Sequence, residues 1–414
     1  MGGHHPNRET LSRFTKGELP PDEARGIERH LATCSDCRDR VDELSTRVQL
    51  DPWLRPGYDQ AFDRATERMT EQLAGFWGER RDSEDLLSEL LREPLAKRRQ
   101  RVRDEERFHS LELCELLRAQ SKEKWFSDPA AGLDLAELAV EAAEHLDPAR
   151  YGSHLVTDAQ ALSWAYLGNG FRIVFDLWQA EKAMHRAWCL QLQDDGDPYS
   201  KAELLNLTSS LLNVQGRYDE AIRLTDKAIS LYREVDDPHF EGSALIQKGL
   251  HLSGQGRYQE AILQFQMGLN RVNPERDPRL LLVGKNNLIS ALSLIGHPEQ
   301  AWRLLKESEP LYQELGDRIL LARLIELRGI VARDLGRFAE AEVFMWESRE
   351  IFLENHLGGD VFRISMDLAD VYAQTGRQRQ VRAILGEVIP LGEAMGLRQG
   401  VLMARLLYEQ ASRR

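Results

Sequence analysis

The side chains best suited to chemistry lie close together near the start of the chain. The segment HLATCSDC holds His30, Cys34 and Cys37, three ligands for a soft metal ion, in a chain with only four cysteines. Their i, i+4, i+7 spacing brings all three to one side of a helix and of the turn that follows it. Thiolate and imidazole groups bind Zn²⁺ tetrahedrally, so these three ligands leave one coordination position to fill.

The fourth ligand of this site must come from outside the segment. His5, which precedes Pro6 at the start of the first predicted helix, is the nearest candidate and would tie that helix to the others. His4 is the competing donor, and an aspartate or a water molecule is a further alternative. Closure by His5 would give a structural site with two histidines and two cysteines. An open position would allow catalysis, but no residue nearby looks like its general base.

Two other interpretations of the cysteine pair are weaker. A Cys-x-x-Cys pair can be a dithiol redox centre, but such a pair usually starts a helix after a β-strand, and no strand pattern precedes Cys34. The thiols could also be incidental. Because two of the four cysteines fall in one motif, while Cys114 and Cys189 stand alone in helix-like segments as expected core residues, metal binding is favoured.

Residues 1–50 are predicted to form a small domain of three helices, over Arg8–Lys16, Glu23–Leu31 and Cys37–Val48. A domain of this length with so few large apolar side chains buries little core and needs an additional crosslink. One structural zinc ion would supply it.

The C-terminal part of the chain repeats itself at an interval of 40 residues. A glycine-led string recurs five times: GRYDEA from Gly216, GRYQEA from Gly256, GHPEQA from Gly296, GRFAEA from Gly336 and a degenerate GRQRQV from Gly376. Seven residues before each glycine stands a small residue in four of the five copies: Ser209, Gly249, Gly329 and Ala369, with Ile289 as the exception. A repeat of this length is one pair of helices that stacks on its neighbours.

Each position of the string has a physical role. The glycine ends the first helix in a left-handed turn, the aromatic residue fills the gap between the paired helices, and the alanine lets the second helix approach. Asp237, Asp277 and Asp317 recur at the same interval and mark where one repeat passes to the next. Residues 196–414 therefore resemble the tetratricopeptide repeat family in its 40-residue form. The degenerate last copy is expected to be a terminal cap whose outer face meets water.

Upstream the pattern is weaker. The string that begins at Asp176 lies 40 residues before Gly216, so Trp178 should be a core aromatic of an older repeat, and 107–195 is read as degenerate repeats. The predicted fold is all-α, with a right-handed solenoid of about seven helix pairs that starts near Arg107. The recurring arginines after the glycines are expected to be solvated.

Residues 51–106 are predicted to be a helical linker. Tyr58–Arg92 reads as a long amphipathic helix, packed on the solenoid or, as the alternative, on a protein partner. Lys97–Arg103 carries five basic residues, but the acidic Asp104–Glu106 follows directly. Because these acids cancel much of the local field, a solvated helix face is favoured over a nucleic-acid contact.

The composition limits the class of protein. No window approaches the roughly 18 uninterrupted apolar residues of a membrane helix, and the N-terminus lacks the apolar core of a signal peptide, so a cytoplasmic location is predicted. The net charge of -13 argues against non-specific binding to nucleic acid, because phosphates would be repelled. The repeats carry no catalytic motif, such as a glycine-rich phosphate loop or a Gly-x-Ser-x-Gly turn, and an enzyme is not expected.

Residues 5 to about 45 resemble the zinc-finger domain of zinc-binding anti-sigma factors. The resemblance is carried by His5-Pro6, by the segment LSRFTKGEL from Leu11, and by HLATCSDCR from His30. It implies that His5, His30, Cys34 and Cys37 bind zinc and that the domain binds an extracytoplasmic-function sigma factor. This chain differs from the best-known members because it has a tetratricopeptide solenoid where they have a transmembrane segment and a periplasmic sensor.

Two functions follow as expectations. The first is a non-enzymatic, anti-sigma-like regulator that binds a sigma factor through residues 1 to about 100, while the solenoid senses a peptide, a protein or a small ligand. The second is a tetratricopeptide scaffold or adaptor whose groove binds a protein or peptide partner. In that case the finger is a structural docking or dimerisation module.

Overall fold

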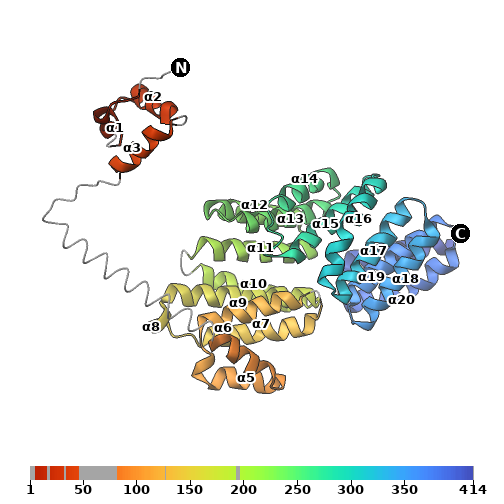
Figure 1. Cartoon of the computed structure of the whole chain (residues 1–414). Helices are drawn as coiled ribbons and strands as arrows, with labels where there is room; N and C mark the ends of the chain where they lie inside the picture. The colour runs from red at the N-terminus through yellow and green to blue at the C-terminus, as the bar shows by residue number, and fades with distance from the viewer. Residues whose placement is uncertain are drawn as a thin grey trace. The chain divides into compact units, whose positions relative to one another are not determined.

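The structure describes residues 5–15, 19–31, 34–45, 82–125, 127–192 and 196–413. This computed structural model holds helices and turns in these ranges and no β-strand, which confirms the all-α fold. The chain divides into two compact units, Met1–Gly78 and Glu79–Arg414 (Figure 1). The finer domain boundaries given by the sequence stay predictions. Within the described ranges, no helix combines the length and the apolar character needed to cross a membrane.

The first unit is held by very little apolar packing. Asn7 caps its first helix, because the Asn7 Oδ1 atom accepts the backbone N–H of Thr10 at 2.8 Å. Leu11, Ile27 and Cys37 are its buried side chains among those described. The small core expected from the sequence is therefore present. Its described residues form three helices: α1 (Arg8–Thr15), α2 (Pro21–Leu31) and α3 (Ser35–Ser45).

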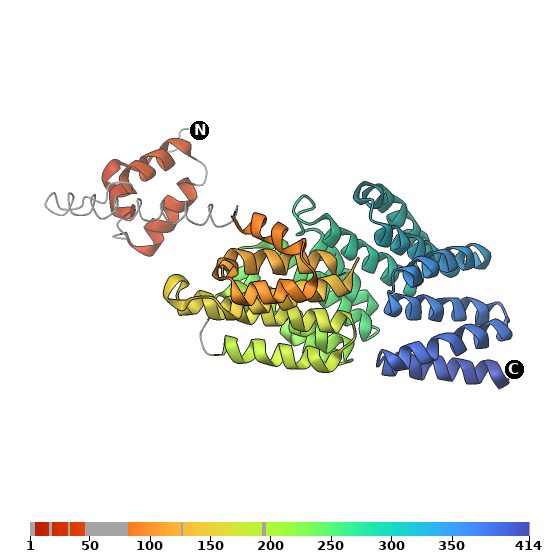
Figure 2. The ribbon, with the colours of Figure 1, turned by 90° about the horizontal axis from the view of Figure 1, so that it is seen from below.

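The second unit is a solenoid of paired helices (Figures 1 and 2). Its described part begins with a helical segment at 82–91, followed by α5 (Leu95–Asp104) and a 3₁₀ turn, η1 (Glu106–Phe108), and α8 (Pro148–Tyr151) is a short helix before α9. Seven pairs follow in the described residues, as predicted: α6 (Leu111–Lys124) with α7 (Pro129–Glu144), α9 (Ser153–Ile173) with α10 (Leu177–Gln191), α11 (Pro198–Val214) with α12 (Tyr218–Glu234), α13 (Pro238–Gly254) with α14 (Tyr258–Leu269), α15 (Pro278–Leu294) with α16 (Pro298–Leu315), α17 (Arg318–Asp334) with α18 (Phe338–Glu354), and α19 (Gly358–Gln374) with α20 (Gln378–Ala394). A last helix, α21 (Arg398–Arg413), stands after them.

The turns and helix starts of the repeats follow the predicted chemistry. Gly216 has φ of 75° and Gly256 has φ of 78°, the left-handed conformation that glycine adopts without strain. The carboxylates of Asp237, Asp277 and Asp317 each accept backbone N–H groups in the first turn of α13, α15 and α17. These residues therefore mark the repeat boundaries.

The small residues seven positions before the turns lie where two helices cross closely. A Cβ atom placed on Gly249 would lie 2.5 Å from the ring of Phe265, and one on Gly329 would lie 2.8 Å from Cγ of Met345. Ser209 and Ala369 are buried at the equivalent positions.

Gly249→Ala is expected to lower the stability of the solenoid by about 2 kcal/mol, because the aromatic ring cannot yield and overpacking outweighs the gain in helix propensity. The matched variant Gly329→Ala should lower stability less, by about 1 kcal/mol, because its Cβ would meet one methionine atom at 2.8 Å rather than several ring atoms at closer range. Urea unfolding of both variants measures the difference. Equal losses of stability would contradict this packing argument.

The repeat before Gly216 departs from the regular interval. Trp178 was expected in the core, but its side chain is 61% exposed. Helix α10 begins at Leu177, and the residue in the left-handed conformation is Phe175, with φ of 63°. The distance along the chain from this turn to the next, at Gly216, is one residue longer than the 40-residue interval of the other repeats. Trp178 is therefore displaced from the core position, and the core prediction for it is wrong.

Phe175 joins two distant parts of the solenoid. A bulky side chain at positive φ is strained, and here the ring lies against the start of α19. A Cβ atom on Gly359 would be 2.8 Å from Cε2 of Phe175, so only glycine leaves room for the ring. Figure 1 shows this end of α9 next to the blue helices of the last repeats.

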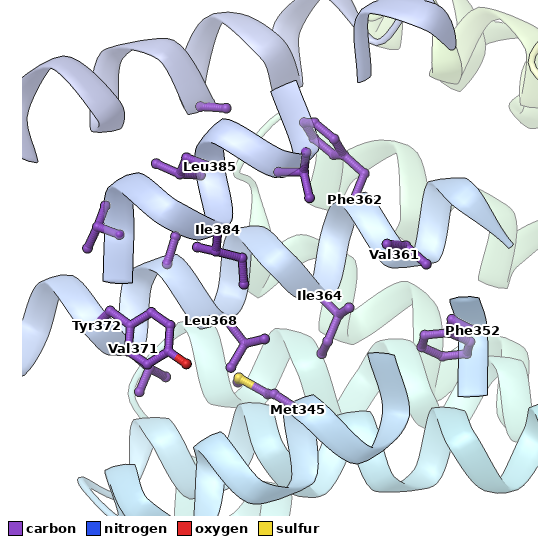
Figure 3. Packing of buried hydrophobic residues seen from close by; sticks show 14 of the residues in the cluster. Met345, Phe352, Val361, Phe362, Ile364, Leu368, Val371, Tyr372, Ile384 and Leu385 are labelled. Atoms are coloured by element: carbon purple, nitrogen blue, oxygen red, sulfur yellow. The ribbon is translucent and has the colours of Figure 1, made fainter. Parts of the chain in front are cut away.

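The degenerate fifth copy is not the terminal cap that its missing aromatic residue predicts. Helix α21 follows it and packs on α20, with Val401, Ala404 and Ala411 buried. These side chains belong to the same core as Phe362 and Leu385, which Figure 3 labels. The outermost surface of the described solenoid therefore belongs to α21.

The basic run at residues 97–103 attaches α5 to its neighbours. Arg101 donates to Glu105 at 2.7 Å, and Arg103 donates to Glu141 of α7 at 2.8 Å. Both guanidinium groups are therefore paired with carboxylates. This agrees with the expectation that nearby acidic residues offset the charge of the basic run.

Most of the predicted amphipathic helix Tyr58–Arg92 lies outside the described residues. So does the apolar stripe assigned to it, which comprises Phe62, Met69, Leu73, Phe76 and Trp77. Residues 82–91 are helical, and their buried Leu87 and Leu90 share a core with Phe108. This end of the segment therefore packs on the start of the solenoid.

Candidate metal centre

Three segments of the first unit bring the candidate ligands together. His5 lies three residues before the start of α1, His30 lies in the last turn of α2, Cys34 directly precedes α3, and Cys37 lies in the first turn of α3. The short connection between α2 and α3 places three ligands from one continuous stretch on one side. The fourth ligand, His5, stands before α1. It reaches the other three because α1 packs against α3.

Three of the separations between the four donor atoms are those of a tetrahedral zinc site. His5 Nδ1 lies 3.3 Å from Cys37 Sγ and 3.4 Å from Cys34 Sγ, and His30 Nε2 lies 3.3 Å from Cys37 Sγ. All four atoms lie within 4.8 Å of one another. The usual Zn–S and Zn–N bond lengths would separate ligands of one ion by about 3.3 to 3.8 Å.

The histidine rings and the buried thiol suit a cation at the centre. The imidazoles of His5 and His30 stand nearly perpendicular, at 87°, with their centroids 5.4 Å apart. Burial and the neighbouring Cys34 raise the pKa of the Cys37 thiol. A divalent ion at this point would reverse that effect by holding the sulfur as thiolate.

The site fits a structural ion. Four side chains of the chain supply all the ligands of a tetrahedron, and no position is left for a substrate or a reactive water molecule. Their convergence crosslinks α1, α2 and α3. The competing ligand His4 lies outside the described residues. No strand lies beside the cysteines in residues 5–45 as far as these are described, and α3 begins at Ser35, between the two thiols.

The remaining two cysteines belong to the second unit. Cys114 is fully buried in the solenoid, and burial raises the pKa of its thiol to about 12. Cys189 is partly buried and lies 3.4 Å from Nδ1 of His185. Cys114 is thus the core residue that the sequence suggested.

Comparisons with known proteins agree with both units. Residues 8–38 match the family model described as "Putative zinc-finger", and residues 201–273 match the "Tetratricopeptide repeat" model. The chain joins a zinc finger to a tetratricopeptide-repeat solenoid. No curated protein matches the chain.

Solved structures resemble the tetratricopeptide-repeat solenoid in fold. A Rap protein complexed with competence and sporulation factor is 12% identical, over 72% of this chain and 82% of that one, with a TM-score of 0.58. NprR in complex with its cognate peptide NprX is 12% identical, over 72% and 84%, with a TM-score of 0.53. The Rap conjugation gene regulator of the plasmid pLS20, in complex with the Phr* peptide, is 11% identical, over 98% and 96%, with a TM-score of 0.52. At these identities the likeness concerns the fold.

Proposed function

We propose that this chain is a non-enzymatic cytoplasmic regulator of the anti-sigma type. His5, His30, Cys34 and Cys37 bind one zinc ion, and the helices that it holds together bind an extracytoplasmic-function sigma factor. The convergence of these four donors, three of which lie inside the segment matched by the zinc-finger model, supports the proposal most directly. The zinc has a structural role here, because four protein ligands complete its coordination.

The solenoid is the sensing part in this proposal. A stack of helix pairs forms an extended surface on which peptides and partner segments bind. Among the similar folds, NprR and the pLS20 regulator are complexes with peptides. We therefore propose a peptide as the signal that the solenoid receives.

The docking surface of the zinc finger is polar. Among the side chains described in residues 5–45, none of the large apolar ones is exposed, whereas Arg38, Asp39 and Arg40 of α3 are. Association with the partner should therefore depend on charge and weaken as salt is added.

Arg38→Glu is expected to weaken the complex with the sigma factor about tenfold at low salt, because it reverses an exposed charge on α3 without touching the zinc ligands. Arg223→Glu makes the same change on an exposed position of α12 and should leave affinity unchanged. Titration of the full chain with purified sigma factors encoded next to its gene measures both. If none of them binds the unsubstituted chain, the anti-sigma function is wrong.

A scaffold role is the second candidate, favoured by the peptide complexes among the similar folds. There the solenoid alone would bind the partner, and the zinc finger would be a docking or dimerisation module. Chelating the zinc from the full chain separates the two functions. Loss of partner binding supports the anti-sigma function, and full retention supports the scaffold.

A further inference from the structure

One half-buried arginine of the solenoid, Arg172, has no carboxylate partner among the described residues. Arg172 lies in the last turn of α9, and its Nε donates to Oδ1 of Asn169 at 2.8 Å. Burial alone lowers the pKa of Arg172 to about 10, with no carboxylate near enough to oppose the effect. The carbonyl groups at the end of α9 favour a cation here, but they are partial dipoles and not an anion.

Arg363 of the same solenoid is an arginine with a lowered pKa that does have carboxylate partners. Its side chain is 46% exposed, and desolvation together with the charge of Arg323 lowers its pKa to about 10. Its guanidinium, however, contacts the carboxylates of Glu326 and Asp360. Half-buried cations in proteins are normally paired in this way, so the unpaired Arg172 calls for a separate explanation.

Asn169 adds a second donor without a partner. Its side chain is only 1% exposed, and its Oδ1 is occupied by Arg172, which fixes the orientation of the amide. Its Nδ2 finds no acceptor among the described residues. A buried N–H without an acceptor is rare, because it loses its hydrogen bonds to water. The two side chains together present only donors, from the guanidinium and from the amide.

The neighbourhood of these donors is the part of the solenoid where distant helices meet. The charge of Arg172 contributes, after burial, to lowering the pKa of His251 on α13. In the turn after α9, Phe175 contacts Gly359 of α19. The end of α9 that carries Arg172 is therefore close enough to His251 of α13 to affect its charge, and it contacts α19 through Phe175.

We propose that Arg172 and Asn169 form a binding site for an oxyanion, and that the natural occupant is a carboxylate of the peptide that the solenoid senses. The two Nη atoms of the guanidinium match the two oxygens of a carboxylate, and Nδ2 of Asn169 supplies a third donor. The identity of the occupant rests on the proposed peptide sensing. The oxyanion site itself does not require the zinc finger or a sigma factor.

The test measures the melting temperature of the full chain with simple oxyanions. The probes are inorganic phosphate and N-acetyl-glycylglycine, each compared with sodium chloride at the same ionic strength, and the C-terminal amide of the same dipeptide is the uncharged control. At ten times the dissociation constant, a bound probe should raise the melting temperature by about 2 °C. The amide should give no rise. A response to phosphate but not to the dipeptide would overturn the carboxylate assignment.

Two substitutions test whether the rise in melting temperature with oxyanions comes from Arg172 and Asn169. Arg172→Met removes the unpaired charge, so it should raise the melting temperature without ligand and abolish the oxyanion effect. Asn169→Asp places a carboxylate beside the guanidinium, so it should also stabilise the chain and block the probes. Because both variants are expected to be more stable, a failure to fold cannot produce the expected result.

Arg363→Met is the matched control. It removes a cation of equally lowered pKa but leaves Glu326, which is only 3% exposed, without a partner, so the melting temperature should fall. Its response to both probes should persist. The proposal is wrong if neither probe exceeds chloride, or if Arg172→Met responds as the unsubstituted chain does. If the chain binds a sigma factor but shows either of these results, the oxyanion site is wrong and the proposed function still holds.

Discussion

Replacing Cys37 by serine should release the zinc and unfold residues 5–45, while the solenoid keeps its structure. Cys37 Sγ lies 3.3 Å from both His5 Nδ1 and His30 Nε2, and the side chain is fully buried. The unit has few other buried side chains. In zinc-finger peptides the binding of the ion contributes about 10 to 16 kcal/mol at neutral pH, far more than a core of this size can supply.

Metal analysis of the purified full chain should give one zinc per chain, and none for Cys37→Ser. Amide hydrogen exchange should then show loss of protection in α1 to α3 and unchanged protection in α6 to α20. Cys189→Ser, which alters a thiol on α10, is the matched control and should keep its zinc. Retention of the metal together with a protected α1 in Cys37→Ser would rule out the assigned site.

Acid should destabilise the solenoid through His251. This imidazole is fully buried on α13, where Nδ1 lies 2.9 Å from Oδ1 of Asn213 and Nε2 lies 3.1 Å from Oγ of Ser209. Burial, and secondarily the charge of Arg172, lower the pKa of His251 to about 4. In the unfolded chain the pKa returns to about 6.5. Between pH 6.5 and 4 the unfolded chain therefore binds a proton that the folded chain does not.

This difference in bound protons determines that the free energy of unfolding falls as the pH falls. At pH 7 both states are neutral at this residue, and as the pH falls from 6.5 to 4 the folded state loses about 3 kcal/mol relative to the unfolded state. His251→Gln should be less stable at pH 7, because packing is lost, but it should lose about 3 kcal/mol less than the unsubstituted chain on acidification.

Urea unfolding at pH 7 and at pH 4.5 measures the effect. His185→Gln, on the exposed surface of α10, is the matched control and should follow the pH dependence of the unsubstituted chain. Parallel pH profiles for His251→Gln and the unsubstituted chain would show that this histidine is not the source of acid sensitivity.

The repeats could be predicted from the sequence because the same close helix crossings and helix starts require the same residue types in each repeat. Gly249 has a small side chain because the ring of Phe265 occupies the space beside it, and Asp237 caps a helix that has to begin there. The prediction failed for Trp178, because Phe175 stands where the other repeats have a left-handed glycine. Without that glycine, nothing in the sequence marks the turn or its displacement by one residue.

The candidate site was only partly visible in the sequence for a similar reason. His30, Cys34 and Cys37 are close along the chain, so helix geometry alone groups them. The choice of His5 depends on how α1 packs on α3, and the resemblance to a known finger supplied it before the structure did. Arg172 carried no signal, because only the folded solenoid shows that no carboxylate lies beside it.

The contact between Phe175 and Gly359 changes how the solenoid should respond to force and to denaturant. In an open array each repeat touches only its neighbours, so the ends fray first and stability grows with the number of repeats. Here the turn after α9 also contacts the beginning of α19, so repeats that are far apart along the array touch directly. The repeats between them should therefore unfold together more than those of an open array.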